Sequence, residues 1–155
     1  MKAQAEITVP GRIGEAEALW YDTSRWASFI DGFHHVVSVD DGWPAEGSLV
    51  WDSSPDGRGR VMETTERYDP RVEHVVAVDE ARISGTQVLR FTARDSDRFR
   101  MSLELRYKLK EKPGGALSPI VDFFFIRPRQ REALARTLVR FARELAGERA
   151  LESDN

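Results

Sequence analysis

The chain has 155 residues, 41% of them hydrophobic, with 23 Lys and Arg against 26 Asp and Glu and a formal charge of −3. This length predicts one folded domain at residues 1–150, followed by a polar tail at 151–155. The acidic balance argues against nucleic acid as the main partner, and no apolar run reaches the roughly 20 residues of a membrane span. Cysteine is absent, which excludes thiolate nucleophiles, cysteine-ligated zinc and disulfides and is typical of a cytoplasmic protein.

The first 30 residues predict one strand and two short helices. Apolar residues alternate with polar ones over 3–9, a half-buried strand that Pro10 and Gly11 end. Helical spacing of apolar residues follows at 12–21. Asp22 then offers N-cap chemistry for a second short helix that carries Trp26 inward.

After Gly32 the hydrophobic pattern changes to a period of two, which predicts an antiparallel sheet. The clearest strand is 99–109, where one face is wholly apolar and the other is charged or polar. Strand 59–68 has no clear inward face, because Val61 and Met62 lie on opposite parities. In all, six strands are expected here, around residues 33–39, 49–51, 59–68, 72–78, 89–93 and 99–109.

The C-terminal quarter predicts a long helix. After a linker at 112–115, an apolar stripe at spacings of four, three and four is formed by Leu134, Leu138, Phe141 and Leu145. Pro128 lacks an amide proton, so we expect the segment to be kinked or split there. Residues 127–149 hold 7 Arg and 3 Glu, a local charge of +4. Such a run is usually a solvated helix face, and the alternative is contact with anionic lipid or an acidic ligand.

An antiparallel sheet with one dry face needs a cover, and the long C-terminal helix is the element large enough to provide it. The expected class is therefore α+β. At this point the sequence resembles the START-like helix-grip superfamily (SRPBCC), in its polyketide cyclase/dehydrase-like branch. The resemblance is best over residues 7–70 and rests on Ala18, Leu19, Trp20, Asp22, Trp26, Phe29, Gly32, Gly47, Trp51, Gly59, Glu63, Tyr68, Asp69 and Pro70.

The resemblance implies a curved sheet wrapped around the long helix, with a hydrophobic cavity between them for a lipid, sterol or polyketide. Some relatives cyclise or dehydrate polyketides, and others only carry a ligand, so the fold does not decide the function. No cofactor is expected. By our register, the ligand-lining residues are Phe33, Trp51, Val76, Phe91, Met101, Leu103, Leu105, Phe124, Leu134, Leu138 and Phe141.

Three side chains are candidates for proton transfer. His35 and His74 fall on the inward parity of their strands, where an imidazole is able to act as general acid or base. The alternative is a core histidine with its hydrogen bonds satisfied. Glu63 lies on a strand that borders the expected cavity, and surface display is the competing interpretation. No metal-ligand spacing is present, nor any GxSxG, GxxxxGK or GxGxxG motif.

Three functions therefore remain open: binding or transport of a hydrophobic small molecule, polyketide cyclisation or dehydration, and protein interaction without a ligand. The apolar run 123–125 admits two interpretations as well. It is either a gate or membrane-touching patch at the cavity mouth, hinged at Pro128, or a packed helix start or homodimer contact.

Overall fold

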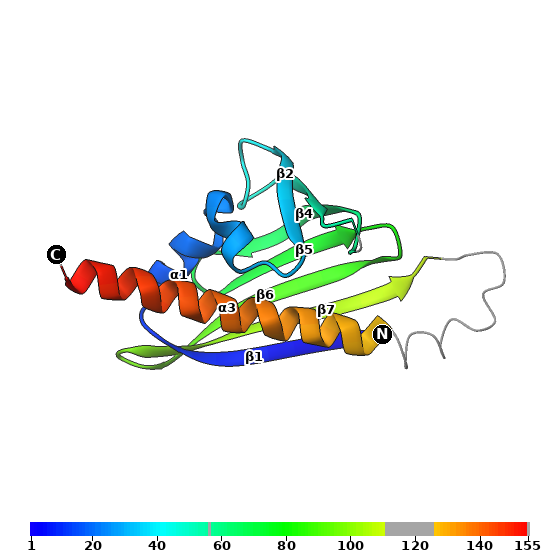
Figure 1. The fold of residues 1–155 in the computed structure, drawn as a ribbon. Coiled ribbons are helices and arrows are strands. Elements are labelled where there is room, and N and C mark those ends of the chain that lie inside the picture. Colours follow the sequence, from blue (N-terminus) through cyan, green and yellow to red (C-terminus); the bar gives the residue numbers. More distant parts are fainter. Residues whose placement is uncertain (56, 111–125, 155) are drawn as a thin grey trace.

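The structure is a computed structural model that describes residues 1–55, 57–110 and 126–154. A strand and two short helices precede six further strands, and a long helix ends the chain (Figure 1). The elements are β1 (Lys2–Pro10), α1 (Ile13–Trp20), the 3₁₀ helix η1 (Thr23–Ser28), β2 (Phe33–Val39), β3 (Ser48–Ser53), β4 (Arg60–Asp69), β5 (Glu73–Asp79), β6 (Ile83–Asp95), β7 (Arg98–Leu109) and α3 (Arg127–Ser153).

The strands form one antiparallel sheet in the order β1-β7-β6-β5-β4-β3-β2. Each strand from β2 to β7 pairs with its predecessor or successor in sequence, and β1 returns beside β7 to form the other edge. The sheet curves, and α3 lies across it alongside β1 (Figure 1). The predicted α+β helix-grip architecture, including the two short helices after the first strand, is therefore confirmed.

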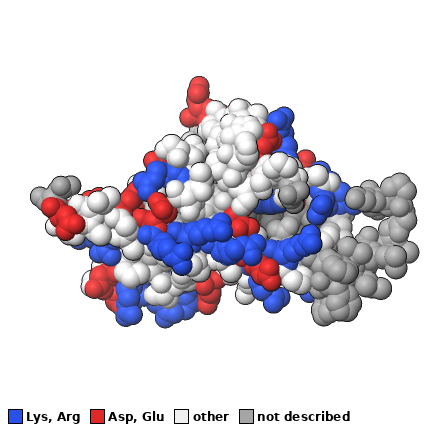
Figure 2. Space-filling model, viewed as in Figure 1, with Lys and Arg blue, Asp and Glu red and all other residues white. Residues whose placement is uncertain are grey.

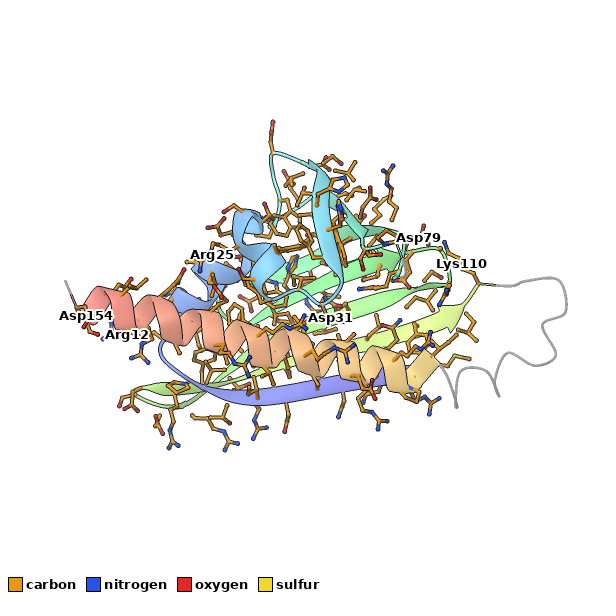
Figure 3. The ribbon with its side chains drawn as sticks, in the orientation of Figure 1. Arg12, Arg25, Asp31, Asp79, Lys110 and Asp154 are labelled. Atoms are coloured by element: carbon orange, nitrogen blue, oxygen red, sulfur yellow. The ribbon has the colours of Figure 1, made fainter. Side chains whose placement is uncertain are left out.

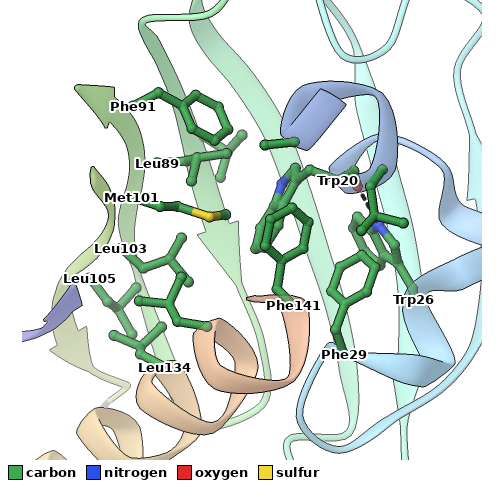
Figure 4. Packing of buried hydrophobic residues seen from close by; sticks show 14 of the residues in the cluster. Trp20, Trp26, Phe29, Leu89, Phe91, Met101, Leu103, Leu105, Leu134 and Phe141 are labelled. Atoms are coloured by element: carbon green, nitrogen blue, oxygen red, sulfur yellow. Dashed lines mark hydrogen bonds between the residues drawn. The ribbon is translucent and has the colours of Figure 1, made fainter. Parts of the chain in front are cut away.

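The core lies between the sheet and α3. Leu134, Leu138, Phe141 and Leu145 are buried, so the predicted apolar stripe faces the sheet. Phe141 lies against Trp20, with ring centroids 5.5 Å apart (Figure 4). Burying each such side chain stabilises the fold by about 1.5–3 kcal/mol.

Ion pairs fasten α3 to the segment around η1. Asp31 accepts from the guanidinium groups of Arg136 at 2.9 Å and Arg140 at 3.2 Å. Arg25 donates to Glu144 on the next turns of α3 at 2.8 Å (Figure 3). These contacts join residues more than 100 positions apart, and they fix α3 along one flank.

The ends of α3 differ in part from expectation. The described helix begins at Arg127, with Pro128 in its first turn, where the missing amide proton breaks no intrahelical hydrogen bond. The segment on which the expected kink or split depends lies outside the described residues. The helix also continues to Ser153, which makes most of the expected polar tail helical. Phe124 and the run 123–125 lie outside the described residues. No helix in the described part of the chain is long and apolar enough to span a bilayer.

The sequence predicts the inward-facing residues of strand β2 less well than those of strand β7. Val37 and Val39 share the parity of His35 and were expected to face inward, but each is 41% exposed. Val39 opposes buried Leu49 and so keeps the expected face, whereas Val37 falls within an irregularity. The pairing with β3 shifts between Phe33 and His35 and again between Val36 and Ser38. Each irregularity inserts a residue and reverses the alternation, so a strict period of two fails along this edge strand.

Candidate functional site

Three polar side chains face the core from the middle of the sheet. Directly opposed residues in neighbouring antiparallel strands share a face, so buried partners identify the face of a polar residue. Glu63 opposes Leu49 and Val78, which are buried. Gln87 opposes Val76 and Leu105, which are also buried, and Thr65 opposes Val76. Glu63, Thr65 and Gln87, which we call the concave polar strip, therefore lie on the face turned toward α3.

The concave polar strip is reached by solvent although its neighbours are buried. Glu63, Thr65 and Gln87 are each half-buried, and so is β6 on both faces from Ser84 to Val88. Further along β6, Leu89 and Phe91 are buried while Arg90 is exposed. Packing therefore closes one end of the concave face more tightly than the other, and the polar strip belongs to the open end.

Glycine at position 85 keeps that open end free of a side chain. Glu63, Val78, Gly85 and Tyr107 oppose one another in turn across β4, β5, β6 and β7, and we call this row the cross-strand series of Glu63. A Cβ atom on Gly85 would lie 2.0 Å from the carbonyl oxygen of Arg106, so no other residue fits without a backbone shift. The close approach of the β7 backbone therefore requires glycine at this position.

Glu63 has the properties of a proton donor or acceptor. Trp51 Nε1 donates to its Oε2 atom at 2.6 Å, while its other oxygen has no hydrogen bond within the described residues. Burial raises the pKa of the Glu63 carboxyl, and the Trp51 hydrogen bond and Arg58 oppose part of that rise. Arg58 lies 5.4 Å from the centre of the Trp51 ring and pairs with buried Glu80. A carboxyl in this setting exchanges protons closer to neutrality than an exposed one.

His74 is held as a neutral imidazole by a directed set of hydrogen bonds. Thr65 Oγ1 donates to the Pro44 carbonyl at 2.8 Å, so it must accept from His74 Nε2 at 2.9 Å. His74 Nδ1 is then unprotonated and accepts from the Tyr21 hydroxyl at 3.0 Å. Burial lowers the pKa of His74 from 6.5 to about 4, and the Pro44 carbonyl opposes part of that shift. Both ring nitrogens are occupied, which favours the satisfied core histidine over a general base.

A chain of aromatic rings surrounds these polar groups. Tyr21 and Trp43 have ring centroids 5.4 Å apart, and Trp43 lies 6.0 Å from Trp26. The chain continues from Trp26 to Phe33 at 6.0 Å and from Phe33 to Trp51 at 5.8 Å. The indole Nε1 of Trp43 is buried and lacks a hydrogen-bond partner in the part of the chain that the structure describes. These aromatic faces suit the binding of a flat, apolar molecule.

His35 is wrongly placed by the sequence-based register. Its side chain is 54% exposed and lies 3.4 Å from Asp52 on the neighbouring strand. Its Nδ1 atom also contacts that of His34 at 2.8 Å. The irregularity between Phe33 and His35 turns the imidazole away from the core. His35 is therefore withdrawn as a candidate for proton transfer on the concave face.

The predicted lining residues lie together in the core. Phe33 is half-buried and packs on its edge, whereas Phe124 lies outside the described residues. The others belong to one buried cluster: Trp51, Val76, Phe91, Met101, Leu103, Leu105, Leu134, Leu138 and Phe141. That these residues contact a ligand remains a prediction.

Four residues near the site were missed by sequence reasoning: Tyr21, Trp43, Arg58 and Gln87. Gln87 shares its parity with Leu89 and Phe91, so extending that strand by two residues would have found it. The others come from a helix end and from turns, whose positions no periodicity gives.

An open hollow lies near the N-terminal end of α3, and most of its lining residues belong to the outer face of the sheet. It reaches Gly85 and Tyr107, which continue the cross-strand series of Glu63, but it contains neither Glu63 nor His74. Its lining is Met1, Lys2, Ser84, Gly85, Thr86, Arg106, Tyr107, Lys108 and Arg127. Among the described residues, no three His, Asp or Glu side chains converge as a metal site would require.

No family model matches the chain, and no curated protein matches it. Solved structures match it over nearly its whole length. A protein from Thermus thermophilus has a TM-score of 0.76 at 14% identity, covering 96% of this chain and 99% of that one. The Zhui aromatase/cyclase from Streptomyces sp. R1128 has a TM-score of 0.67 at 14% identity, covering 96% and 92%.

A di-domain aromatase/cyclase from the steffimycin biosynthetic pathway has a TM-score of 0.71 at 18% identity and covers 96% of this chain. The match covers 51% of that protein, so this chain spans about half of its length. Identities this low establish a shared fold. The chain therefore adopts the START-like helix-grip fold that its sequence resembles, and aromatase/cyclases are among the structures that share it.

Proposed function

We propose that the chain binds a largely apolar, ring-containing small molecule against the concave face of the sheet. The observation that carries the proposal is the concave polar strip, which stays half-buried among fully buried neighbours. The Gln87 amide has no hydrogen-bond partner within the described residues, and one oxygen of Glu63 has none either. A ligand with an apolar body and a hydroxyl or carbonyl group would satisfy them.

The surroundings of the strip support a ligand of this class. Aromatic rings of Tyr21, Trp43 and Trp51 stand near it, and α3 supplies an apolar cover. The likeness to aromatase/cyclases supports the same class of ligand, since those proteins carry that activity in their names. The absence of cysteine supports a cytoplasmic location.

Dye displacement tests the proposal. An environment-sensitive apolar dye should bind the native chain and be displaced by fatty acids, sterols or aromatic polyketides. Gln87→Leu removes the amide that faces the core, so affinity for a hydroxylated or carbonyl ligand should fall about 2- to 12-fold. Thr86→Val is the matched control, because Thr86 is the next residue and lies on the opposite face. Absence of dye binding, or equal affinity loss in both variants, would contradict the proposal.

Glu63 favours a second candidate, cyclisation or dehydration of a polyketide. The raised pKa of its carboxyl suits transfer of a proton to or from an enolisable carbonyl. Glu63→Gln keeps the size and the Trp51 hydrogen bond but cannot ionise, so kcat should fall by about 10²-fold or more. Glu66→Gln, an exposed neighbour on β4, should leave kcat unchanged. Product formation from a poly-β-ketone mimic measures this, and equal rates in both variants would remove Glu63 from the chemistry.

A further inference from the structure

Charge is distributed unevenly along α3. From Arg127 to Arg143 the sequence holds six Arg and one Glu, a net +5. From Glu144 to Asp154 it holds one Arg and four acidic residues, a net −3. Figure 2 shows the Lys and Arg side chains as a band along α3. The basic half of the helix is its N-terminal half.

This arrangement opposes the helix macrodipole. The N-terminus of a helix carries a partial positive charge and favours acidic residues, while the C-terminus favours basic ones. Helix α3 has no acidic residue in its first turn and no basic residue in its last. Helix stability therefore does not account for the placement of the arginines.

Packing accounts for only two of these arginines, Arg136 and Arg140. Arg136 and Arg140 share the single carboxylate of Asp31. Arg129 and Arg143 are exposed and form no ion pair within the described residues. Because the apolar stripe of α3 faces the sheet, Arg129 and Arg143 on the other side of the helix are free to meet another molecule.

The four arginines form one face. Arg129, Arg136, Arg140 and Arg143 are separated by seven, four and three residues, which places them within a narrow sector of an α-helix. Val139 lies beside them and is 46% exposed, an apolar contact point within the basic face. We call these five residues the arginine face.

We propose that the arginine face docks a protein partner that presents an acidic helix. Side chains of Asp and Glu repeating at three, four and seven residues on such a helix would oppose the arginines one by one. The carboxylates of Glu132 and Asp31 interrupt the arginine face. Separate acidic side chains on a helix therefore suit it better than the continuous negative surface of a membrane. The apolar stripe of α3 is also buried against the sheet and cannot enter a bilayer.

Fluorescence anisotropy at low ionic strength tests the proposal with three probes. The first is a labelled helical peptide, rich in alanine, with Glu on one face at spacings of three, four and seven. The second is a peptide of the same composition in scrambled order, and the third is vesicles containing phosphatidylserine. The native chain should bind the one-face peptide several-fold more tightly than the scrambled one, and binding should weaken as salt is raised.

A matched pair of variants locates the interaction. Replacing Arg129 and Arg143 by Gln should weaken binding of the one-face peptide about 2- to 30-fold, the range expected for two exposed ion pairs. Replacing Arg82 and Arg94 by Gln makes the same charge change on exposed residues outside α3 and should leave binding unchanged. Equal binding of both peptides, tighter binding to vesicles, or equal losses in the two double variants would overturn the proposal.

Discussion

Tyr21 occupies a position where one hydroxyl joins three parts of the fold. It ends α1, and it donates to His74 on β5, whose other nitrogen donates to Thr65 on β4. Thr65 in turn holds the Pro44 carbonyl in the loop between β2 and β3. Burial raises the pKa of the Tyr21 hydroxyl, and Tyr68 and Glu17 add to that rise, so it remains a donor at any ordinary pH. The direction of every bond in the series follows from its other end, because the Pro44 carbonyl can only accept.

Tyr21→Phe should therefore destabilise the protein beyond the loss of one average hydrogen bond. It leaves His74 Nδ1 buried without a donor, and an unsatisfied buried acceptor costs about 1–3 kcal/mol. The phenyl ring keeps its contacts with Trp43 and Tyr68, so packing changes little. Urea unfolding measures the difference in free energy. An unchanged unfolding midpoint would show that the Tyr21 bond contributes nothing.

At the scale of elements, alternation predicts a strand well where one face is dry and the other wet. Strand β7 was expected at 99–109 and runs from Arg98 to Leu109 because its alternation is unbroken. Strand β2 contains two register shifts and β4 contains one, between Thr65 and Arg67. Bulges leave no periodic signature, so the inward faces of these two strands required the structure.

The candidate site was predictable only in its strand residues. His74 came from the alternation of β5, and Glu63 was a candidate because its strand borders the expected cavity; the structure shows that both face the core. Tyr21 meets His74 across 53 positions of sequence, and Trp43 comes from a loop between strands. Tertiary packing brings these groups together, and a single sequence carries no signal for contacts of that separation.

The charge pattern of α3 yields a prediction of its own. Arg129 stands in the first turn, where its charge opposes the macrodipole and has no ion-pair partner within the described residues. Arg129→Gln should raise the free energy of unfolding by about 0.3–1 kcal/mol at low salt. Arg143→Gln, in mid-helix and also unpaired, should change it little. Urea unfolding of both variants measures the effect, and destabilisation by Arg129→Gln would refute a functional origin for the pattern.

At the scale of the whole molecule, several groups link stability to pH. Neighbouring arginines lower the pKa values of the Glu73, Glu104 and Asp95 carboxyls, that of Asp95 to about 2. These pairs favour the folded state above the ordinary carboxyl pKa values and are lost as pH falls below them. Glu63 acts in the opposite direction, because its raised pKa favours the folded state when its carboxyl is protonated. The three arginine-paired carboxyls titrate below the ordinary carboxyl range, whereas the effect of Glu63 extends above it.

At pH values above the titration of the arginine-paired carboxyls, His74 makes the largest contribution to the pH dependence of stability. Its pKa is 6.5 in an ordinary setting and about 4 in the fold, so between those values the unfolded chain binds a proton that the folded chain does not. Stability should therefore fall as pH drops from about 6.5 toward 4, by about 3 kcal/mol in total at 1.36 kcal/mol per pH unit. The charged ring would also lose the Tyr21 donor, because Nδ1 would then carry a proton itself.

His74→Gln isolates this contribution. The Gln oxygen is able to accept from Tyr21 and its amide to donate to Thr65, but the side chain does not titrate. Unfolding free energies measured from pH 7 to pH 5 should decline more steeply in the native protein than in the variant, because the contributions of Glu63 and of the arginine-paired carboxyls are common to both. Parallel curves would mean that His74 takes up its proton equally in both states, and the directed series from Tyr21 to Pro44 would then be incorrect.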